Sequence, residues 1–421
     1  MKLAVVGGGS TYTPELVDGI ARLTGDIKIS ELVLVDPDAE RLAVVGPFSA
    51  RIMARYGHPA TVSWTSDLDA AADGAGAVLI QLRVGGQATR HRDETWPLEC
   101  GCVGQETTGA GGFAKALRTV PVVLDVAARV RERAAADAWI IDFTNPVGIV
   151  TRALLDAGHR AIGLCNVAIG YQREFAHLLQ VAPEAVALDH VGLNHLTWER
   201  AAIVDGVDRL PELLAAHGEQ IATHTGLPLA VTRAVGAVPS YYLRYYWAHD
   251  EVVEEERGRQ TRAQAVAEIE RQLMEMYADP ALDTKPELLT HRGGAFYSEA
   301  AVALLASLVS DSGDRQVVNV RNNGTLPFLS DEAVIEVSAA IGAGGATPVQ
   351  VDPVGPLMSG LIAHVSAYEE LALDAALRGG RDRVAKTLLA HPLIGQYDLA
   401  EKLTDRLLAE NAQFLPWTAG L

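Results

Sequence analysis

Short β-branched apolar runs alternate with longer amphipathic stretches over the first 165 residues. The short runs have the length of buried strands, and the longer stretches repeat apolar residues at helical spacing. This alternation predicts a parallel sheet covered by helices, an α/β fold of the Rossmann-like kind. The expected strands are Lys2–Val6, Glu31–Val35, Ala77–Leu82, Trp139–Phe143 and Ala161–Leu164, and the expected helices are Thr13–Leu23, Ala39–Tyr56 and Lys115–Arg133.

One connection follows neither pattern. From Arg83 to Gly112 the chain shows no clear periodicity and is rich in Gly, Thr and charged residues. A loop of that length within a compact domain is usually functional. We therefore expect this segment to be a long functional loop.

The pattern changes after about Gly170. Longer helices are expected at Gln264–Tyr277 and Ser359–Arg378, mixed with short strands at Val317–Val320 and Val334–Val337. We predict two domains: residues 1–170 form the Rossmann-like unit, and residues 171–421 form an α+β substrate domain.

Composition narrows the class of protein. The chain has 421 residues, of which 49% are hydrophobic and 21% charged, so a soluble globule is expected rather than a disordered chain. Its 35 Lys and Arg against 53 Asp and Glu give a net charge of −18, which disfavours nucleic acid as a partner. Three cysteines cannot form a disulfide framework, which favours a reducing cytoplasm.

Nothing in the hydropathy pattern predicts secretion or membrane insertion. Glycines interrupt the first apolar run after Val6, which is too short for a signal peptide. No later stretch reaches the roughly 18 apolar residues of a membrane span.

A glycine turn follows the first expected strand and precedes a helix. Backbone N–H groups of Gly7-Gly8-Gly9-Ser10 can hold a pyrophosphate there, although Tyr12 stands where the third glycine of G-x-G-x-x-G would be. Asp36 ends the second strand, where a carboxylate binds ribose hydroxyls and repels a 2′-phosphate. The turn therefore favours NAD over NADP. The alternative is an ordinary tight turn with a solvated Asp36.

Cys165 and Asn166 follow the last of the five strands, and His195 comes thirty residues later. A thiolate and an imidazole can bind a divalent metal and leave positions open for substrate oxygens and water. The alternative is a buried thiol that only packs and a structural histidine. Cys100 and Cys102 have no histidine at metal-motif spacing and are interpreted as loop or core thiols.

Taken in order, the motifs resemble those of the family-four glycoside hydrolases. They are Gly7-Gly8-Gly9-Ser10, Val103-Gly104-Gln105-Glu106-Thr107, Asn145-Pro146-Val147, Cys165-Asn166-Val167, Gly192-Leu193-Asn194-His195, Tyr242-Leu243-Arg244-Tyr245-Tyr246 and Asn322-Asn323-Gly324. The resemblance implies a lactate/malate-dehydrogenase-like fold and an enzyme that depends on NAD and manganese. It also implies a homodimer or homotetramer.

The resemblance also implies a substrate and a reaction. Asn166, directly after the metal-binding cysteine, resembles the 6-phospho-β-glucosidases, whereas Ala168 departs from the proline usual in the family. The family's reaction oxidises C3 of the sugar with NAD, removes the C2 proton and eliminates the β-linked group. Water then adds at C1 and C3 is reduced again.

Site residues follow from the same resemblance. Cys165 and His195 resemble the manganese ligands, and Tyr242 the base that takes the C2 proton. Residues that resemble those holding the sugar and its 6-phosphate are Arg90, Glu106, Asn145, Asn166 and Arg262.

Several alternatives stay open at this point. Tyr242 lies in a tyrosine cluster where most rings simply pack, and Arg262 follows an acidic run typical of a solvated helix face. For the whole chain, the alternatives are a family-four enzyme of other sugar specificity, a 2-hydroxyacid dehydrogenase, or a catalytically silent NAD-binding protein.

Overall fold

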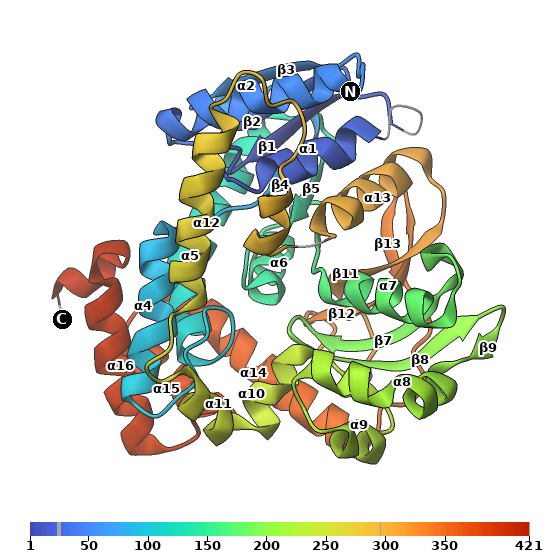
Figure 1. Cartoon of the computed structure of the whole chain (residues 1–421). Helices are drawn as coiled ribbons and strands as arrows, with labels where there is room; N and C mark the ends of the chain where they lie inside the picture. The colour runs from blue at the N-terminus through green and yellow to red at the C-terminus, as the bar shows by residue number, and fades with distance from the viewer. Residues whose placement is uncertain (23–26, 295, 421) are drawn as a thin grey trace.

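The chain builds a nine-stranded mixed sheet (Figure 1). The computed structural model describes residues 1–22, 27–294 and 296–420. Along the sheet the strand order is β13-β12-β11-β6-β5-β4-β1-β2-β3. Six strands are parallel: β1 (Lys2–Val6), β2 (Glu31–Val35), β3 (Thr61–Thr65), β4 (Ala75–Ile80), β5 (Trp139–Asp142) and β6 (Ala161–Gly163). The antiparallel extension consists of β11 (Asp314–Arg321), β12 (Val334–Gly342) and β13 (Gly345–Pro348).

Helices cover both faces of this sheet because the chain moves in two directions from its centre. The crossovers from β1 to β2 and from β4 to β5 run to opposite sides, and right-handed crossovers then place their helices on opposite faces. One layer contains α1 (Thr13–Arg22), α2 (Ala39–Arg55) and α13 (Tyr297–Ser310); the other contains α5 (Gly109–Arg133), α6 (Val147–Asp156) and α14 (Pro356–Arg378).

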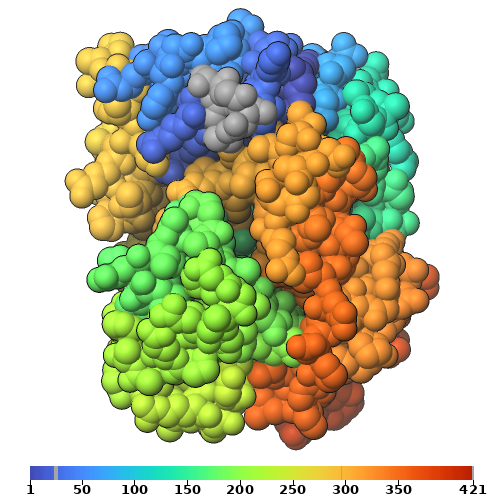
Figure 2. Space-filling model, turned by 90° about the vertical axis from the view of Figure 1, so that its right-hand side faces the viewer, coloured from blue at the N-terminus to red at the C-terminus, as the bar shows by residue number. Residues whose placement is uncertain are grey.

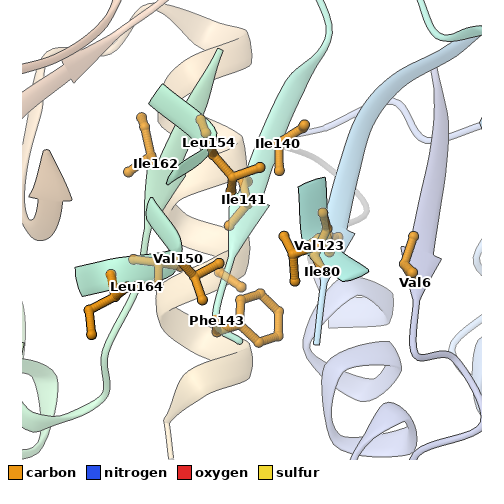
Figure 3. Packing of buried hydrophobic residues seen from close by; sticks show 14 of the residues in the cluster. Val6, Ile80, Val123, Ile140, Ile141, Phe143, Val150, Leu154, Ile162 and Leu164 are labelled. Carbon is orange, nitrogen blue, oxygen red and sulfur yellow. The ribbon is translucent and has the colours of Figure 1, made fainter. Parts of the chain in front are cut away.

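The core lies between the central strands and these helices. Figure 3 shows Ile141 and Ile162 from two neighbouring strands close to Val150 and Leu154 of α6, and Ile80 of the next strand beside Val123 of α5. These side chains are at most 2% exposed. Burying an aliphatic side chain of this size contributes about 1.5–3 kcal/mol, so the apolar runs that predicted the strands also hold the sheet together.

A second, smaller sheet carries a functional turn. Its strands are β7 (Ala187–Leu193), β8 (Leu196–Val204), β9 (Val207–Asp208) and β10 (Val238–Pro239). A two-residue turn, Asn194–His195, joins β7 to β8. The hydroxyl of Ser338 on β12 donates to the carbonyl of Leu188 on β7 at 2.8 Å, which ties the two sheets together.

Ten further α-helices lie in the described part of the chain. They are α3 (Leu68–Ala72), α4 (Gly86–Glu99), α7 (Val167–Leu179), α8 (Leu210–Thr225), α9 (Leu229–Val235), α10 (Arg244–Trp247), α11 (His249–Glu256), α12 (Arg262–Tyr277), α15 (Arg381–Ala390) and α16 (Tyr397–Asn411). Among the described residues, no helix combines the length and the apolar character needed to span a bilayer.

The predicted α/β class is confirmed, and the expected strands of the first domain lie within two residues of the observed ones. The first helix also matches, with Leu23 outside the described residues. The separation of residues 1–170 from 171–421 stays a prediction, since β11–β13 of the later segment extend the first sheet.

Two expectations about local structure were wrong. The segment Arg83–Gly112 is not one long loop, because α4 occupies Gly86–Glu99 and α5 already begins at Gly109. The apolar periodicity is missing because α4 buries polar side chains, among them Thr89, Asp93 and Glu94. The sheet also has an edge strand, β3, that the pattern did not predict, because its residues are mostly exposed and polar.

Candidate active site

The carboxyl ends of β1, β4, β5 and β6 meet at one edge of the sheet. The strand order reverses between β1 and β4, and ligands of open α/β sheets bind at such a point. A cavity of about 310 Å³ lies there. Seven of the predicted residues line it: Ser10, Arg90, Glu106, Asn145, Asn166, Tyr242 and Arg262.

The glycine turn lies at one end of this cavity and packs closely against β2. Gly7 has φ +86°, a conformation that favours glycine. A Cβ on Gly8 would lie 2.7 Å from the Cβ of Leu34, and one on Gly9 3.0 Å from the Cγ of Asp36. The half-buried Asp36 accepts the Gly9 N–H at 3.1 Å. A turn held this close to the acidic end of β2 fits an NAD dinucleotide.

Tyr12 stands at the position of the third glycine of the motif, and its hydroxyl connects the glycine turn to a later segment of the chain. Its hydroxyl donates to the Gly294 carbonyl at 2.7 Å and accepts the Ser298 N–H at 3.0 Å. Beside it, Arg292 donates to the hydroxyl of Thr11 at 2.7 Å and to Glu270 at 3.0 Å. The turn near the N-terminus is thereby joined to a segment almost three hundred residues later.

Glu106 lies at the centre of a buried cationic cluster. It is 6% exposed, accepts hydrogen bonds from Lys115 Nζ at 2.7 Å and from Arg83, and forms an ion pair with Arg90 Nε at 3.0 Å. Burial alone would raise the pKa of Glu106, but Arg83, Lys115 and Arg90 hold it well below its usual value. Arg90 also pairs with Glu94 at 2.7 Å. The cluster therefore presents positive charge to the cavity while Lys115 is protonated.

Three further predicted residues line the same cavity from different elements. Asn145 follows β5, and its Oδ1 is buried without a hydrogen-bond partner among the described residues. Asn166 precedes α7. Arg262 begins α12, is exposed, and donates to the carbonyl of His291 at 2.8 Å. Arg262 is therefore exposed, as expected of a solvated arginine, and it also lines the cavity.

Cys165 and His195 lie behind the cavity wall, each in contact with a tyrosine that lines it. The hydroxyl of Tyr297 donates to the Cys165 sulfur at 4.0 Å. The ring of His195 stacks on that of Tyr242, with centroids 3.7 Å apart and 12° between planes. The predicted metal ligands and the predicted base are thereby brought together.

The donor chemistry of this corner fits a divalent metal. Burial lowers the pKa of His195 to about 4, so its imidazole is neutral, and its Nδ1 is buried without a partner among the described residues. Burial, followed by the charge of Glu336, raises the pKa of the Cys165 thiol to about 12. A cation would favour the thiolate and use the imidazole. No group of three or more His, Cys, Asp or Glu in the described chain is arranged for a metal, so these two residues would leave positions for water and substrate.

A larger cavity of about 670 Å³ lies between α7 and α13. Figure 2 shows the surface hollowed between the green and orange regions that contain these helices. Cys165 is the one predicted site residue in the lining described for it. Because the convergent polar groups line the smaller cavity, we assign the candidate site to that one.

Several residues that line the cavity were not predicted from the sequence. Arg83, Lys115, Arg292 and Tyr297 line it beside the predicted set. Lys115 had a detectable signal, because it is the one charged residue in the apolar segment from Gly109 to Leu117. Arg292 and Tyr297 had none, since only tertiary structure brings them to the glycine turn and to Cys165.

Comparison with protein families supports one relationship over almost the whole chain. Residues 2–181 match the family model described as family 4 glycosyl hydrolase. Residues 190–394 match the model of the C-terminal domain of the same family.

Individual relatives agree with this match. A protein of Bacillus subtilis strain 168 named "probable 6-phospho-beta-glucosidase" is 35% identical over 99% of this chain and 97% of its own length. The structure of the 6-phospho-β-glucosidase from Thermotoga maritima with manganese, NAD⁺ and glucose 6-phosphate is 33% identical, covers 99% of both chains and has a TM-score of 0.91. Malate dehydrogenase from Salinibacter ruber, 18% identical with a TM-score of 0.55 over 91% of this chain and 99% of its own, shares the fold.

Proposed function

The chain belongs to the family 4 glycosyl hydrolases, and we propose that it hydrolyses β-linked 6-phosphoglucosides with NAD and Mn²⁺ as cofactors. The observation that carries the proposal is the cavity where Tyr242 lies between a cationic cluster and the Cys165–His195 corner, next to the glycine turn. A 2-hydroxyacid dehydrogenase has less support, because the likeness to malate dehydrogenase is one of fold.

The two cofactors supply chemistry that side chains lack. When bound, NAD accepts and returns the hydride at C3 of the sugar, and Mn²⁺ acts as a Lewis acid on the C3 oxygen. Gly7-Gly8-Gly9-Ser10 and Asp36 would hold the dinucleotide, and Cys165 and His195 the metal. Oxidation at C3 acidifies the neighbouring C2–H, so the residues of the chain must then remove that proton and hold the sugar.

Tyr242 is the proposed base for the C2 proton. Burial, followed by Cys165 and Tyr245, raises the pKa of Tyr242 well above its usual value, whereas Arg90 acts in the opposite direction. A phenol in this setting is neutral at pH 7, and positive charge in the assembled site favours its ionised form. Elimination of the β-linked group and addition of water at C1 complete the hydrolysis.

The cationic side of the cavity supports binding of a sugar phosphate. Arg262 at the mouth suits the 6-phosphate, since a guanidinium binds phosphate oxygens in a bidentate way. Arg90 and Glu106 offer donors and an acceptor to sugar hydroxyls. The Asn145 Oδ1, which has no hydrogen-bond partner among the described residues, would accept from another hydroxyl, and Asn166 completes the proposed sugar contacts.

The proposal extends to assembly and cell compartment. We infer a homodimer or homotetramer acting in a reducing cytoplasm. The three cysteines are free thiols, and Cys165 serves as a ligand only while it is reduced.

A substrate panel tests the function. We expect p-nitrophenyl β-glucoside 6-phosphate to be cleaved with NAD, Mn²⁺ and a reducing agent, and the α-linked and unphosphorylated counterparts to be poor substrates. EDTA should abolish the cleavage. Preference for the α-linked phosphate would mean that the enzyme is a family member specific for α-linked rather than β-linked 6-phosphoglucosides. Activity that survives EDTA would contradict the role of the metal.

A further inference from the structure

Beneath the Cys165–His195 corner lies a buried carboxylate that the proposed reaction does not use. Glu336 on β12 is 1% exposed. Its Oε2 accepts from Asn194 Nδ2 at 2.9 Å and from Asn319 Nδ2 at 2.8 Å, and its Oε1 lies 3.2 Å from His190 Nε2. Three side chains from two sheets therefore converge on one carboxylate.

The chain of hydrogen bonds continues away from the site. His190 Nδ1 lies 2.7 Å from Glu199 Oε1, and both residues are 1% exposed. Burial lowers the pKa of His190, but Glu199 and Glu336 together raise it to about 10, so the imidazole is protonated at pH 7. It balances one of the two carboxylates and leaves one negative charge on the group. A buried negative charge favours a cation nearby over an apolar or anionic neighbour.

Asn194 connects this charge to both proposed metal ligands. It directly precedes His195 in the two-residue turn, and its side chain lies close enough to the Cys165 thiol to lower the pKa of that thiol. His195 has φ +64°, a left-handed conformation that a non-glycine residue adopts only when its surroundings hold it there. The bond from Asn194 to Glu336 anchors this turn to the main sheet.

We propose that Glu336 is the positioning residue of the metal site. Through Asn194 it fixes the turn that presents His195, and it supplies the buried negative charge that a divalent cation between Cys165 and His195 requires. This inference rests on the proposed function, because it takes those two residues as the ligands. Residues that orient metal ligands from behind typically contribute a 10- to 100-fold effect on affinity.

A nearby glutamate provides a matched control. Glu369 on α14 is half-buried, and a small cavity that His195 lines includes it. Among the described residues it has no hydrogen bond to Asn194 or His190. Burial raises the pKa of Glu369 to about 8, so its carboxyl is mostly protonated at pH 7. Glu369→Gln therefore tests the loss of a carboxyl group beside His195 without a loss of charge and without touching the chain of bonds.

The experiment measures Mn²⁺ binding to the reduced full-length protein by electron paramagnetic resonance, with NAD affinity and thermal unfolding as separate readouts. We expect Glu336→Gln to weaken Mn²⁺ binding roughly 10- to 100-fold, while NAD affinity stays unchanged and Glu369→Gln behaves as the wild type. A folded Glu336→Gln protein with wild-type Mn²⁺ affinity would overturn the inference, as would an equal loss in Glu369→Gln.

Asn194→Ala supplies a second route if Glu336→Gln does not fold. It should weaken Mn²⁺ binding to a similar degree. Where both single variants fold, the double variant should lose no more than the larger single loss, because the effect of Asn194 runs through its bond to Glu336. A folded Asn194→Ala protein of wild-type affinity, or strictly additive losses, would contradict the inference. Cys165→Ser distinguishes failure of the proposed function from failure of this inference. Unchanged Mn²⁺ affinity in Cys165→Ser would refute the assignment of Cys165 as a ligand. Weakened Mn²⁺ binding in Cys165→Ser, together with wild-type affinity in Glu336→Gln, would refute only the role of Glu336.

Discussion

Glu106 and Glu336 are both buried glutamates near Tyr242, yet their surroundings have opposite charge. Glu106 is surrounded by Arg83, Arg90 and Lys115, and the cluster also contains Glu94; three cations against two carboxylates leave +1. Glu336 receives bonds from two amides and from His190, which it shares with Glu199. One imidazolium against two carboxylates leaves −1.

The difference shows that neighbours rather than residue type decide what a buried carboxylate does. At Glu106 cations hold the pKa low and still leave an excess that suits a sugar phosphate. At Glu336 burial opposes ionisation, but bonds from His190 and Asn194 keep its pKa low. The remaining negative charge there suits a metal ion. Tyr242 contacts the first environment through the cavity and the second through the ring of His195.

The largest effect is expected where the two environments meet. Tyr242→Phe removes the proposed base but leaves both charge clusters in place, so turnover should fall by about 10²- to 10⁴-fold. Affinities for Mn²⁺ and glucose 6-phosphate should stay near the wild-type values. Steady-state kinetics and ligand titrations check the two halves of this expectation.

Tyr241 gives the control for that experiment. Its ring is 39% exposed and its hydroxyl bonds Arg244, so Tyr241→Phe should retain activity. In the wild type, label at C2 of a deuterated substrate should exchange with solvent during turnover. Full retention of the label, or an active Tyr242→Phe enzyme, would remove Tyr242 from the role of base.

A smaller effect is expected from a change on the cationic side alone. Arg262→Gln removes a charged hydrogen-bonding group worth about 1.5–3 kcal/mol, so the Kd of glucose 6-phosphate should rise roughly 10- to 100-fold. Glucose and Mn²⁺ should bind as before. Calorimetric titration tests this, with Arg271→Gln as control because Arg271 lies on the same helix and pairs only with Glu268 and Glu275 among the described residues. Equal affinity in Arg262→Gln and the wild type would exclude Arg262 from the phosphate site.

Local sequence rules predicted part of the site and part of the fold. The glycine turn and Asp36 are visible because a strand, a turn and an acidic strand end follow local rules. The apolar runs likewise predicted the central strands. Helix α4 was missed because its buried face is polar, and burial of polar groups such as Asp93 depends on partners such as Arg118 from another helix.

The sequence could not show which buried charged groups pair with residues that are distant along the chain. Glu336 lies 142 residues from Asn194 and 146 from His190, and no local spacing connects them. The roles of Cys165, His195 and Tyr242 came from resemblance alone, because a thiol, a histidine and one tyrosine among several carry no specific spacing. The stacking of His195 on Tyr242 is information that only the fold supplies.

The smallest expected effect comes from one titrating charge in the cationic cluster. Burial lowers the pKa of Lys115 to about 7, with Arg83 and Arg90 acting in the same direction against Glu106. Below pH 7 the ammonium is charged and the cluster carries +1; as pH rises through 7 toward 9 the lysine loses its proton and the cluster becomes neutral. A sugar phosphate is already a dianion in this range, since its second pKa is about 6. One screened charge is worth about 1 kcal/mol, and half of the lysines are already neutral at pH 7, so the Kd should rise by about threefold between pH 7 and 9. Calorimetric titration of glucose 6-phosphate at pH 7 and 9 measures the change.

Lys115→Arg is the control, and it should bind glucose 6-phosphate equally well at both pH values because arginine does not titrate there. If the affinity of the wild type is as independent of pH as that of the arginine variant, Lys115 keeps its proton and the cluster keeps its charge.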